Sequence, residues 1–311
     1  MYRSLNDVLR SRFGCKVYKL SLSTGCSCPN RDGTLDTRGC IFCNGSGDFT
    51  ASSSLPVVEQ IEQAKYLVAK KAKDAKYIAY FQDYTNTHAP AEKLEPLFLE
   101  AIQQPDVVAL SIATRPDCLG PEILAMLARL RTIKPVWVEL GLQTMHEKTA
   151  QYIRRGYPLS VYEEAVHNLH AAGCELITHM ILGLPGETPE MMAESARYIG
   201  SSGADGIKFH LLHVLHGTDL EREYTAGAFH TLELEEYIDI LEDCLRVLPP
   251  ETVIHRLTGD GAKRSLIAPL WSADKKHVLN EIHRRFAADH LVQGERYSVD
   301  TTHEMCYSWS R

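Results

Sequence analysis

A strand-like run, Val17-Tyr-Lys-Leu-Ser-Leu22, stands directly before a loop of glycines and cysteines that reaches Cys43. The same unit recurs along the chain: a short apolar run, then a longer amphipathic one. Continuous apolar runs are typical of parallel strands that are buried on both faces. The predicted strands are Val17–Leu22, Tyr77–Phe81, Val107–Ile112, Val136–Leu140, Leu176–Leu182 and Gly206–Leu211.

Amphipathic segments separate these strands, and their apolar residues recur with the period of a helix. Pro90, Pro121 and Pro189 stand at or near helix starts, where a missing amide proton costs little. Six strand–helix units in series predict an α/β fold with a parallel sheet and right-handed crossovers. Because eight units make a full barrel, we expect a partial (β/α)6 TIM-like barrel. The predicted helices are Val57–Lys73, Ala91–Gln103, Pro121–Leu130, Ser160–Ala172 and Pro189–Ser201.

The regular alternation of strands and helices ends after residue 218. Beyond it, a helix at Leu232–Leu248 and a strand at Val253–Leu257 are predicted. In sheets of this kind the functional side chains lie on loops at the carboxyl ends of the strands. The predicted parts are a lead-in of residues 1–15, a barrel of residues 16–218 with a cysteine loop at 24–47, and a C-terminal α/β extension of residues 219–311.

The composition is that of an ordinary globular protein. Of 311 residues, 44% are hydrophobic and 23% charged, which excludes a disordered chain and a coiled coil. The longest stretches without a charged residue, Leu20–Asn30 and Leu176–Gly186, are too short to cross a bilayer. The charged N-terminal residues do not resemble a secretory signal, so the expected compartment is the cytoplasm, without membrane attachment.

Four of the nine cysteines, Cys26, Cys28, Cys40 and Cys43, fall within eighteen residues. A local cluster in a cytoplasmic chain indicates a metal or redox site rather than a disulfide scaffold. If all four thiolates bind, they form a closed structural zinc site. If only Cys28, Cys40 and Cys43 bind, a [4Fe–4S] cluster keeps one iron without a protein ligand, which is the arrangement of a catalytic site. The spacing leaves both possibilities open.

The chain resembles the radical S-adenosylmethionine (SAM) superfamily. Within it, the sequence is similar to the elongator-like branch and its YtqA/YhcC (MnmL-type) subgroup, from about Leu5 to Trp271. The motifs that carry the resemblance, in chain order, are Cys28-Pro-Asn-Arg-Asp-Gly-Thr34, Gly39-Cys40-Ile-Phe-Cys43, Tyr80-Phe-Gln-Asp-Tyr-Thr-Asn-Thr87, Ser111-Ile-Ala-Thr-Arg-Pro-Asp117, Val138-Glu-Leu-Gly-Leu-Gln-Thr144, Gly183-Leu-Pro-Gly186 and His255-Arg-Leu-Thr-Gly-Asp-Gly261.

The resemblance implies that Cys28, Cys40 and Cys43 bind a [4Fe–4S] cluster, that Cys26 does not, and that SAM binds at the open iron. An electron from a reductant such as flavodoxin or ferredoxin then drives SAM cleavage and hydrogen abstraction from the substrate. The alternative is a protein that is not an enzyme. It would carry an iron–sulfur cluster or a four-cysteine zinc site and would sense redox state or hold a partner. Polar residues at the ends of four successive strands argue against that alternative.

The first of these polar residues follow the second and third strands. The resemblance places the amino and carboxylate groups of SAM near Gln82, Thr85 and Asn86. Alternatively, these side chains form a turn that caps the next helix. Arg115 follows the third strand, and it suits either a carboxylate or ribose-bearing ligand or an ion pair with Glu139.

The remaining candidates lie on the fourth to sixth strands. Glu139 interrupts an apolar run, so this buried carboxylate must have a partner, either the cofactor or Arg115. His179 is either a satisfied core residue or a lumen residue that borders the ligand. Lys208 and His210 alternate on the sixth strand and are expected to point into the lumen together. The last two cofactor candidates are Gln143, after the fourth strand, and Gly183, in a turn expected to approach the adenine.

The same resemblance implies a tRNA partner, with conversion of a wobble-uridine carboxymethylaminomethyl group to aminomethyl. The net charge of −7 opposes a polyanion, but between His255 and Arg296 eight Lys and Arg stand against five Asp and Glu. That stretch is either an RNA-holding surface at the barrel mouth or a solvated face. His255 and Asp260 are candidates to approach the base. The phosphate-binding candidates are Lys263, Arg264, Lys275, Lys276, Arg284 and Arg285.

Overall fold

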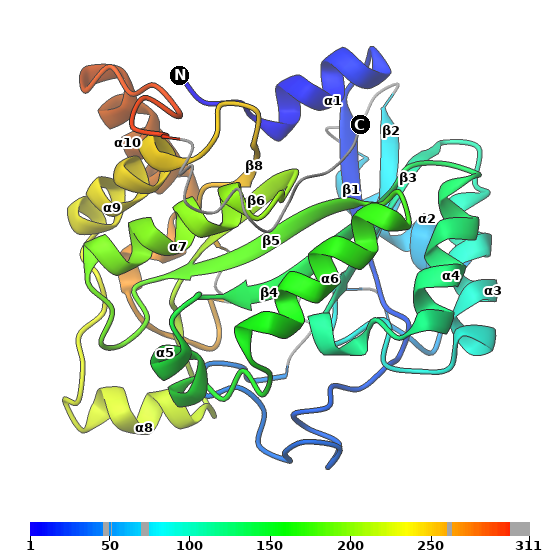
Figure 1. The fold of residues 1–311 in the computed structure, drawn as a ribbon, viewed down its shortest axis with the longest axis horizontal. Helices are drawn as coiled ribbons and strands as arrows, with labels where there is room; N and C mark the ends of the chain where they lie inside the picture. Colours follow the sequence, from blue (N-terminus) through cyan, green and yellow to red (C-terminus); the bar gives the residue numbers. More distant parts are fainter. Residues whose placement is uncertain (46–49, 51, 70–74, 260–262, 299–311) are drawn as a thin grey trace.

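Seven parallel strands form one curved sheet in the computed structural model, which describes residues 1–45, 50, 52–69, 75–259 and 263–298. The sheet order is β1-β2-β3-β4-β5-β6-β8, so the first six strands follow one another in chain order (Figure 1). The predicted partial barrel is confirmed. Its strands are β1 (Val17–Leu22), β2 (Lys76–Phe81), β3 (Val107–Thr114), β4 (Val136–Gln143), β5 (Glu175–Leu182), β6 (Gly206–Leu211) and β8 (Val253–Arg256).

Helices cover the outer face of the sheet, because each of them places an apolar side against the outward residues of the strands. Phe81 on β2 and Phe98 on α3, for example, pack edge to face with ring centroids 5.0 Å apart. This outer layer forms the largest hydrophobic core of the molecule. Its helices are α2 (Val57–Val68), α3 (Ala91–Ile102), α4 (Pro121–Arg131), α6 (Leu159–Ala171), α7 (Pro189–Ser201) and α9 (Leu234–Val247).

The inner face of the sheet is a lumen, and alternate residues of every strand point into it. At the amino ends the inward side chains are apolar, with Ile78, Trp137 and Ile177 among them. One step further along the strands, the inward residues become polar and charged. The lumen therefore changes from an apolar end to a polar end along the barrel axis. The polar layer, called the lumen cluster below, consists of Lys19, Tyr80, Ser111, Glu139, His179 and Lys208.

Helix α1 (Leu5–Phe13) closes the apolar end of the lumen. Ser4 caps its first turn, and Gly14, at φ +68°, ends it in the left-handed conformation that glycine adopts without strain. Leu9, which is 5% exposed, packs with the apolar lumen side chains. Arg3 and Ser4 also pair with Ile254 on β8, so the lead-in is joined to the far edge of the sheet.

The sequence did not reveal several elements of this structure. Helices α5 (Glu147–Tyr152) and α8 (Asp219–Thr225) are shorter than the period analysis resolves, and α10 (Lys275–Ala288) lies in a charge-rich stretch. Strands β7 (Val214–Leu215) and β9 (Leu266–Ala268) form a separate antiparallel pair. The strand predicted at Val253–Leu257 joins the main sheet as β8, beside β6. The division at residue 218 stays a prediction. Short 3₁₀ turns occur at Pro116–Cys118 and Leu270–Ala273.

Candidate active site

A pocket of about 340 Å³ opens at the carboxyl ends of the strands, within the size range of ligand sites. The loop of residues 24–45, called the cysteine loop below, lies at this end, whereas α1 lies at the other (Figure 1). Strands β2 to β6 and β8 and the cysteine loop all contribute to its wall. The residues predicted from sequence that line it are Cys28, Cys40, Cys43, Gln82, Thr85, Arg115, Glu139, Gln143, His179, Lys208 and His210.

Tight turns in the cysteine loop hold its three lining cysteines. The carbonyl of Cys28 accepts hydrogen bonds from the amides of Arg31 and Asp32, at 2.7 and 3.1 Å, and the Cys43 amide donates to the Cys40 carbonyl at 3.0 Å. The Arg31 guanidinium donates to the Cys43 carbonyl. That guanidinium also lies so close to Gly39 that a Cβ there would approach it to 2.9 Å.

Asn30 connects the loop to the segment after α5. Its side-chain amide donates to the Arg154 carbonyl at 2.7 Å and lies 3.4 Å from the Cys40 sulfur. Asn30 is 2% exposed, so this donor is held against the thiol inside the protein. Hydrogen bonds to sulfur are one of the means by which a protein tunes an iron–sulfur centre.

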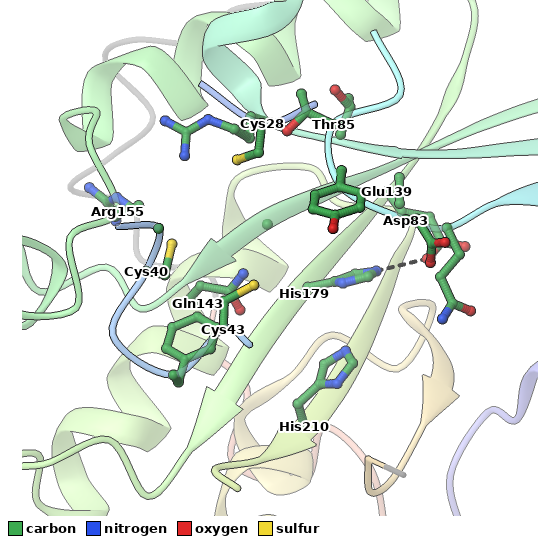
Figure 2. Close-up of a pocket in the computed structure, with 18 of the residues that line it drawn as sticks. Cys28, Cys40, Cys43, Asp83, Thr85, Glu139, Gln143, Arg155, His179 and His210 are labelled. Atoms are coloured by element: carbon green, nitrogen blue, oxygen red, sulfur yellow. Dashed lines mark hydrogen bonds and ion pairs between the residues drawn. The ribbon is translucent and has the colours of Figure 1, made fainter. Parts of the chain in front are cut away.

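Cys26 takes a different position from the other three cysteines. Its side chain packs against the main hydrophobic core and does not line the pocket. Within the described parts of the chain, no three His, Cys, Asp or Glu side chains are grouped closely enough to hold a single metal ion. A tetrahedral zinc site needs four ligands gathered within about 2.3 Å of one centre. This donor set therefore fits a larger cluster held by three thiolates better than a four-cysteine zinc site (Figure 2).

The predicted residues at the end of β2 divide into two groups. Gln82 and Thr85 line the pocket, and the buried Thr85 hydroxyl has no hydrogen-bond partner in the described structure, so it is available to a ligand. Asn86 is fully buried behind the wall. Its amide donates to the carbonyls of Phe81 and Ala113, each at 3.0 Å, while its oxygen accepts from Thr24 at 2.8 Å. Asn86 thus fixes the loop behind the pocket.

Arg115 pairs with Asp117, which answers the question that the sequence left open about its partner. Its guanidinium donates two hydrogen bonds to this carboxylate, at 2.9 and 2.7 Å, and it stacks 5.1 Å from the Tyr157 ring centroid. The ion pair with Glu139 considered above does not form. Arg115 still lines the pocket, as does Gln143, at φ +69°. Gly183, at φ +88°, faces Leu232 and does not line the pocket.

Glu139 is the centre of the lumen cluster. One carboxylate oxygen accepts from Lys19 at 2.5 Å and from the Ser111 hydroxyl at 2.6 Å. The other accepts from Lys208 and from His179 Nε2, the latter at 2.7 Å (Figure 2). Lys208 also donates to the Tyr80 hydroxyl at 3.0 Å. Four donors from four other strands thus converge on one buried carboxylate.

Burial and charge set the pKa values of this cluster. Burial alone would raise the pKa of Glu139, but Lys19, Lys208 and His179 hold it well below its usual value. Burial lowers the pKa of Lys208 well below the ordinary lysine value, against the attraction of Glu139. Burial, with the neighbouring Lys208 charge, also lowers the pKa of His179 to about 4. His179 is therefore neutral at pH 7, and Glu139 is ionised.

Sequence reasoning missed Lys19, Tyr80 and Arg256, although the last two line the pocket. The signal was available for Lys19, because a lysine inside an apolar strand is as unusual as Glu139 or Lys208. Lys19 was missed because only the residues near the strand ends were considered, and Lys19 lies in the middle of β1. Arg256 is the partner of Lys208 in the β6–β8 register, and that pairing is not visible without the sheet order.

The C-terminal candidates are spread over different places. His255 is half-buried below the pocket, 5.5 Å from the Trp137 ring centroid, and does not line the pocket. Asp260 lies outside the described residues. Helix α10, which carries four of the phosphate-binding candidates, packs near the N-terminus, away from the cysteine loop (Figure 1). Lys263 and Arg264 are exposed, between Gly259, which adjoins His210, and Ser265, which accepts from His216.

Comparisons with known proteins agree with this geometry. The family model of the radical SAM superfamily matches residues 34–199, and that of the radical SAM C-terminal domain matches residues 204–288. The chain is 43% identical over 296 residues to the uncharacterized protein YtqA of Bacillus subtilis, covering 94% of this chain and 92% of that protein. It is 28% identical over 178 residues to a tRNA uridine(34) acetyltransferase of Methanocaldococcus jannaschii, covering 52% of this chain and 32% of that protein.

A solved structure shares the fold. The archaeal Elp3 of Methanocaldococcus infernus, with an N-terminal deletion, superposes with a TM-score of 0.68 at 16% identity. The match covers 89% of this chain and 64% of the Elp3 chain. Among the described residues, no helix is long and apolar enough to span a bilayer.

Proposed function

Since this chain belongs to the radical SAM superfamily, with a [4Fe–4S] cluster and SAM as its cofactors, we propose that it modifies the wobble uridine of tRNA. When bound, the two cofactors supply one-electron chemistry that ends in abstraction of a hydrogen atom from the substrate. The observation that carries the assignment is the convergence of three cysteines and the polar lumen cluster on one pocket.

In this proposal Cys28, Cys40 and Cys43 hold the cluster on one wall of the pocket. The turns at Cys28 and Cys40 fix the positions of the sulfurs, and Asn30 donates to one of them. A site with three protein thiolates leaves a coordination position for SAM, whereas a four-cysteine site is closed.

The residues at the strand ends orient SAM. Gln82 and the Thr85 hydroxyl, which has no partner among the described residues, face the pocket from the segment after β2. Arg115 faces it from directly after β3, and Gln143 from the end of β4. These groups can bind the amino, carboxylate and ribose groups of the cofactor. Arg115 is held rigidly by Asp117 and Tyr157, so it offers its guanidinium in a fixed place at little entropic cost.

The tRNA substrate is supported by the relatives. The Methanocaldococcus jannaschii relative is named for uridine 34 of tRNA, and its matched part covers about half of this chain. Exposed Lys263 and Arg264 lie beside the segment that borders His210, where they can contact phosphates of a nucleotide that enters the pocket. A base must leave its stack to reach such a site.

The test has two stages. Anaerobically reconstituted protein, reduced by dithionite or flavodoxin, is expected to contain about four irons per chain and to cleave SAM. Incubation with tRNA from a strain that lacks this gene, followed by nucleoside analysis, is then expected to convert carboxymethylaminomethyl uridine to aminomethyl uridine. Lys263→Gln with Arg264→Gln is expected to reduce tRNA binding and its salt dependence.

Failure at one stage can be distinguished from failure at the other. Iron binding and SAM cleavage with unchanged wobble nucleosides would retain the radical enzyme and reject the tRNA substrate. Absence of SAM cleavage from protein that carries an intact, reduced cluster would reject the enzyme itself. SAM cleavage without tRNA serves as the control for the Lys263 and Arg264 variants, since neither residue lines the pocket.

A further inference from the structure

Tyr84 takes an unusual position at the mouth of the pocket. Its backbone has φ +55°, in the left-handed region that bulky side chains rarely adopt. Its hydroxyl donates to the carbonyl of Gly45, two residues after Cys43, so the end of the side chain is fixed to the cysteine loop. A residue that is strained in the backbone and also held by a hydrogen bond has little freedom to turn, and such residues are concentrated at functional sites.

The ring of Tyr84 is open to a ligand. It lines the pocket and yet is 46% exposed, so it lies where the pocket meets solvent. Cations cover the rings of Tyr80 and Tyr157, which also line the pocket. Lys208 lies 4.4 Å from the ring centroid of Tyr80, and Arg155 lies 4.8 Å from that of Tyr157. Within the described part of the chain, neither a cation nor a second ring stacks on Tyr84.

The depth of the pocket assigns this ring to the substrate rather than to the cofactor. Thr85, the next residue in the chain and one of the groups proposed to bind SAM, is only 1% exposed. A pocket of about 340 Å³ is at the lower end of the range for a single ligand of drug size, so SAM fills most of it. A base that follows the cofactor into the pocket therefore lies at the mouth, beside Tyr84.

We propose that Tyr84 is the platform on which the target base of an RNA substrate stacks. The proposal rests on the proposed function and deepens it, because the site then recognises the planar ring of the base independently of any substituent on that ring. Aromatic side chains can bind a base in this way because every base has a π face. The left-handed backbone and the bond to Gly45 hold the ring in place, so little freedom is lost when the base binds.

The test compares two variants that differ only in the ring. Tyr84→Phe and Tyr84→Leu both lose the hydroxyl that donates to Gly45, so any effect of that bond on the cysteine loop is common to the two. Cluster-loaded protein saturated with SAM, without reductant, is titrated with an anticodon stem-loop RNA that carries uridine at the wobble position. We expect Tyr84→Leu to bind this RNA about fivefold or more weakly than Tyr84→Phe, as for loss of one base–aromatic stack.

A change in the RNA tests the same contact from the side of the base. Dihydrouridine keeps the hydrogen-bonding groups of uridine but has a puckered ring that is not aromatic. In Tyr84→Phe, replacement of the wobble uridine by dihydrouridine is expected to weaken binding about fivefold or more. In Tyr84→Leu the same replacement is expected to change binding by less than about twofold, because the stacking partner is already lost.

Tyr66→Leu is the matched control. It makes the same substitution at a tyrosine of α2 that is exposed and does not line the pocket. This variant is expected to bind both RNAs as wild-type protein does. The Tm and the iron content of every variant report whether the fold and the cluster are intact, and SAM affinity is measured separately for Tyr84→Phe and Tyr84→Leu.

Three results would overturn this role of Tyr84. Equal binding of the uridine RNA by the Phe and Leu variants would show that the ring is not used. Equal losses on replacement by dihydrouridine in the two variants would show that the base stacks elsewhere. A difference in SAM affinity between the two variants that is as large as their difference in RNA affinity would assign the ring to the cofactor.

Failure of the proposed function gives a different pattern of results. Coupling between Tyr84 and the wobble uridine, without conversion of the wobble nucleoside, would reject the proposed reaction and leave the stacking site supported. Conversion by wild-type protein, with equal RNA binding by the Phe and Leu variants, would retain the reaction and reject the stacking site. Absence of RNA binding by wild-type protein would reject both the tRNA substrate and the stacking site.

Discussion

At the scale of single residues, the cysteine loop separates two roles for cysteine. Cys28, Cys40 and Cys43 face the pocket, whereas Cys26, two residues from Cys28, packs against the hydrophobic core. Each Cys→Ser change at 28, 40 or 43 is expected to abolish iron retention and SAM cleavage, because a serine hydroxyl is a poor ligand for iron in a cluster. Cys26→Ser is expected to retain both the iron and SAM cleavage. Iron analysis and the visible absorbance measure the outcome, and equal loss in all four variants would favour a four-cysteine site.

His179 gives a prediction for stability against pH. Its pKa is about 4 in the folded chain, below the ordinary value of 6.5, because burial and Lys208 disfavour the imidazolium. Between these two values the unfolded chain binds a proton that the folded chain does not, so stability falls as pH decreases from 6.5 to 4. The difference amounts to about 3 kcal/mol across the window.

The matched variant for this prediction is His179→Gln, which keeps a donor towards Glu139. Urea denaturation of the metal-free protein at pH 7, 5.5 and 4.5 is expected to show a smaller loss of stability in this variant than in wild type. The subtraction is needed because His210 and His255 also have lowered pKa values and add slopes of the same sign. Identical slopes in the two proteins would contradict the role of His179.

Sequence reasoning located these residues better than it located their partners. Glu139, His179 and Lys208 were recognisable because a polar residue inside a buried strand needs a compensating group. Which group compensates it depends on strand order, register and rotamer. Arg115 illustrates this limit. It pairs with Asp117, two residues further along the chain, although Glu139 on the neighbouring strand was an equally reasonable partner from sequence.

At the scale of elements, the cysteine loop is shaped by one arginine side chain. Arg31 lies against Gly39 and Gly45, both at positive φ, and donates to the Cys43 carbonyl. A methyl group on Gly39 would approach the guanidinium to 2.9 Å, whereas one on Gly33, at φ +89°, would meet nothing within 4 Å. Gly33 and Gly39 therefore both need a positive φ, but only Gly39 has a side chain packed closely against it.

Gly39→Ala is accordingly expected to displace Arg31 and to lower the iron content after anaerobic reconstitution at least twofold. Gly33→Ala carries the same conformational penalty of about 1 kcal/mol and is expected to keep most of its iron. Iron per chain and Tm of the metal-free protein are the measurements. Equal iron loss in the two variants would show that backbone strain, rather than the Arg31 contact, governs the loop.

The elements that the sequence predicted well are those with a strong pattern. Parallel strands buried on both faces are nearly continuous apolar runs, so β1 and β6 were predicted with the observed ends. The segment of α10 has a weaker pattern, since five of its fourteen residues are charged and only Val278, Ile282 and Phe286 are buried. Such a helix is specified by its tertiary contacts, as the neighbouring Tyr2 shows, and not by a local signal.

At the scale of the whole molecule, stability depends on how the apolar end of the lumen is filled. Leu9 on α1 is 5% exposed and packs in the same cluster as Trp137 and Ile177. Leu9→Ala is expected to lower the free energy of unfolding by about 3 kcal/mol, by lost burial and a residual cavity. Leu35→Ala, at a side chain that is 52% exposed, is expected to change it by less than about 0.5 kcal/mol.

Urea denaturation followed by tryptophan fluorescence measures this difference, since Trp137 lies within the affected cluster. Equal destabilisation by the two substitutions would mean that α1 does not contribute to the folded barrel. Because α1 and the cysteine loop lie at opposite ends of the barrel, Leu9→Ala is expected to leave iron retention unchanged (Figure 1).

A lumen filled at one end has a kinetic consequence. Because α1 and its apolar neighbours fill one end of the barrel, the lumen is open at the other end, where the cysteine loop lies. If the proposed substrate enters through this end, it covers a cofactor that is already bound there, so the cofactor is expected to bind first. The product would then leave before the spent cofactor is exchanged. The proposed reaction is therefore expected to follow a compulsory order of binding, with the cofactor before the substrate.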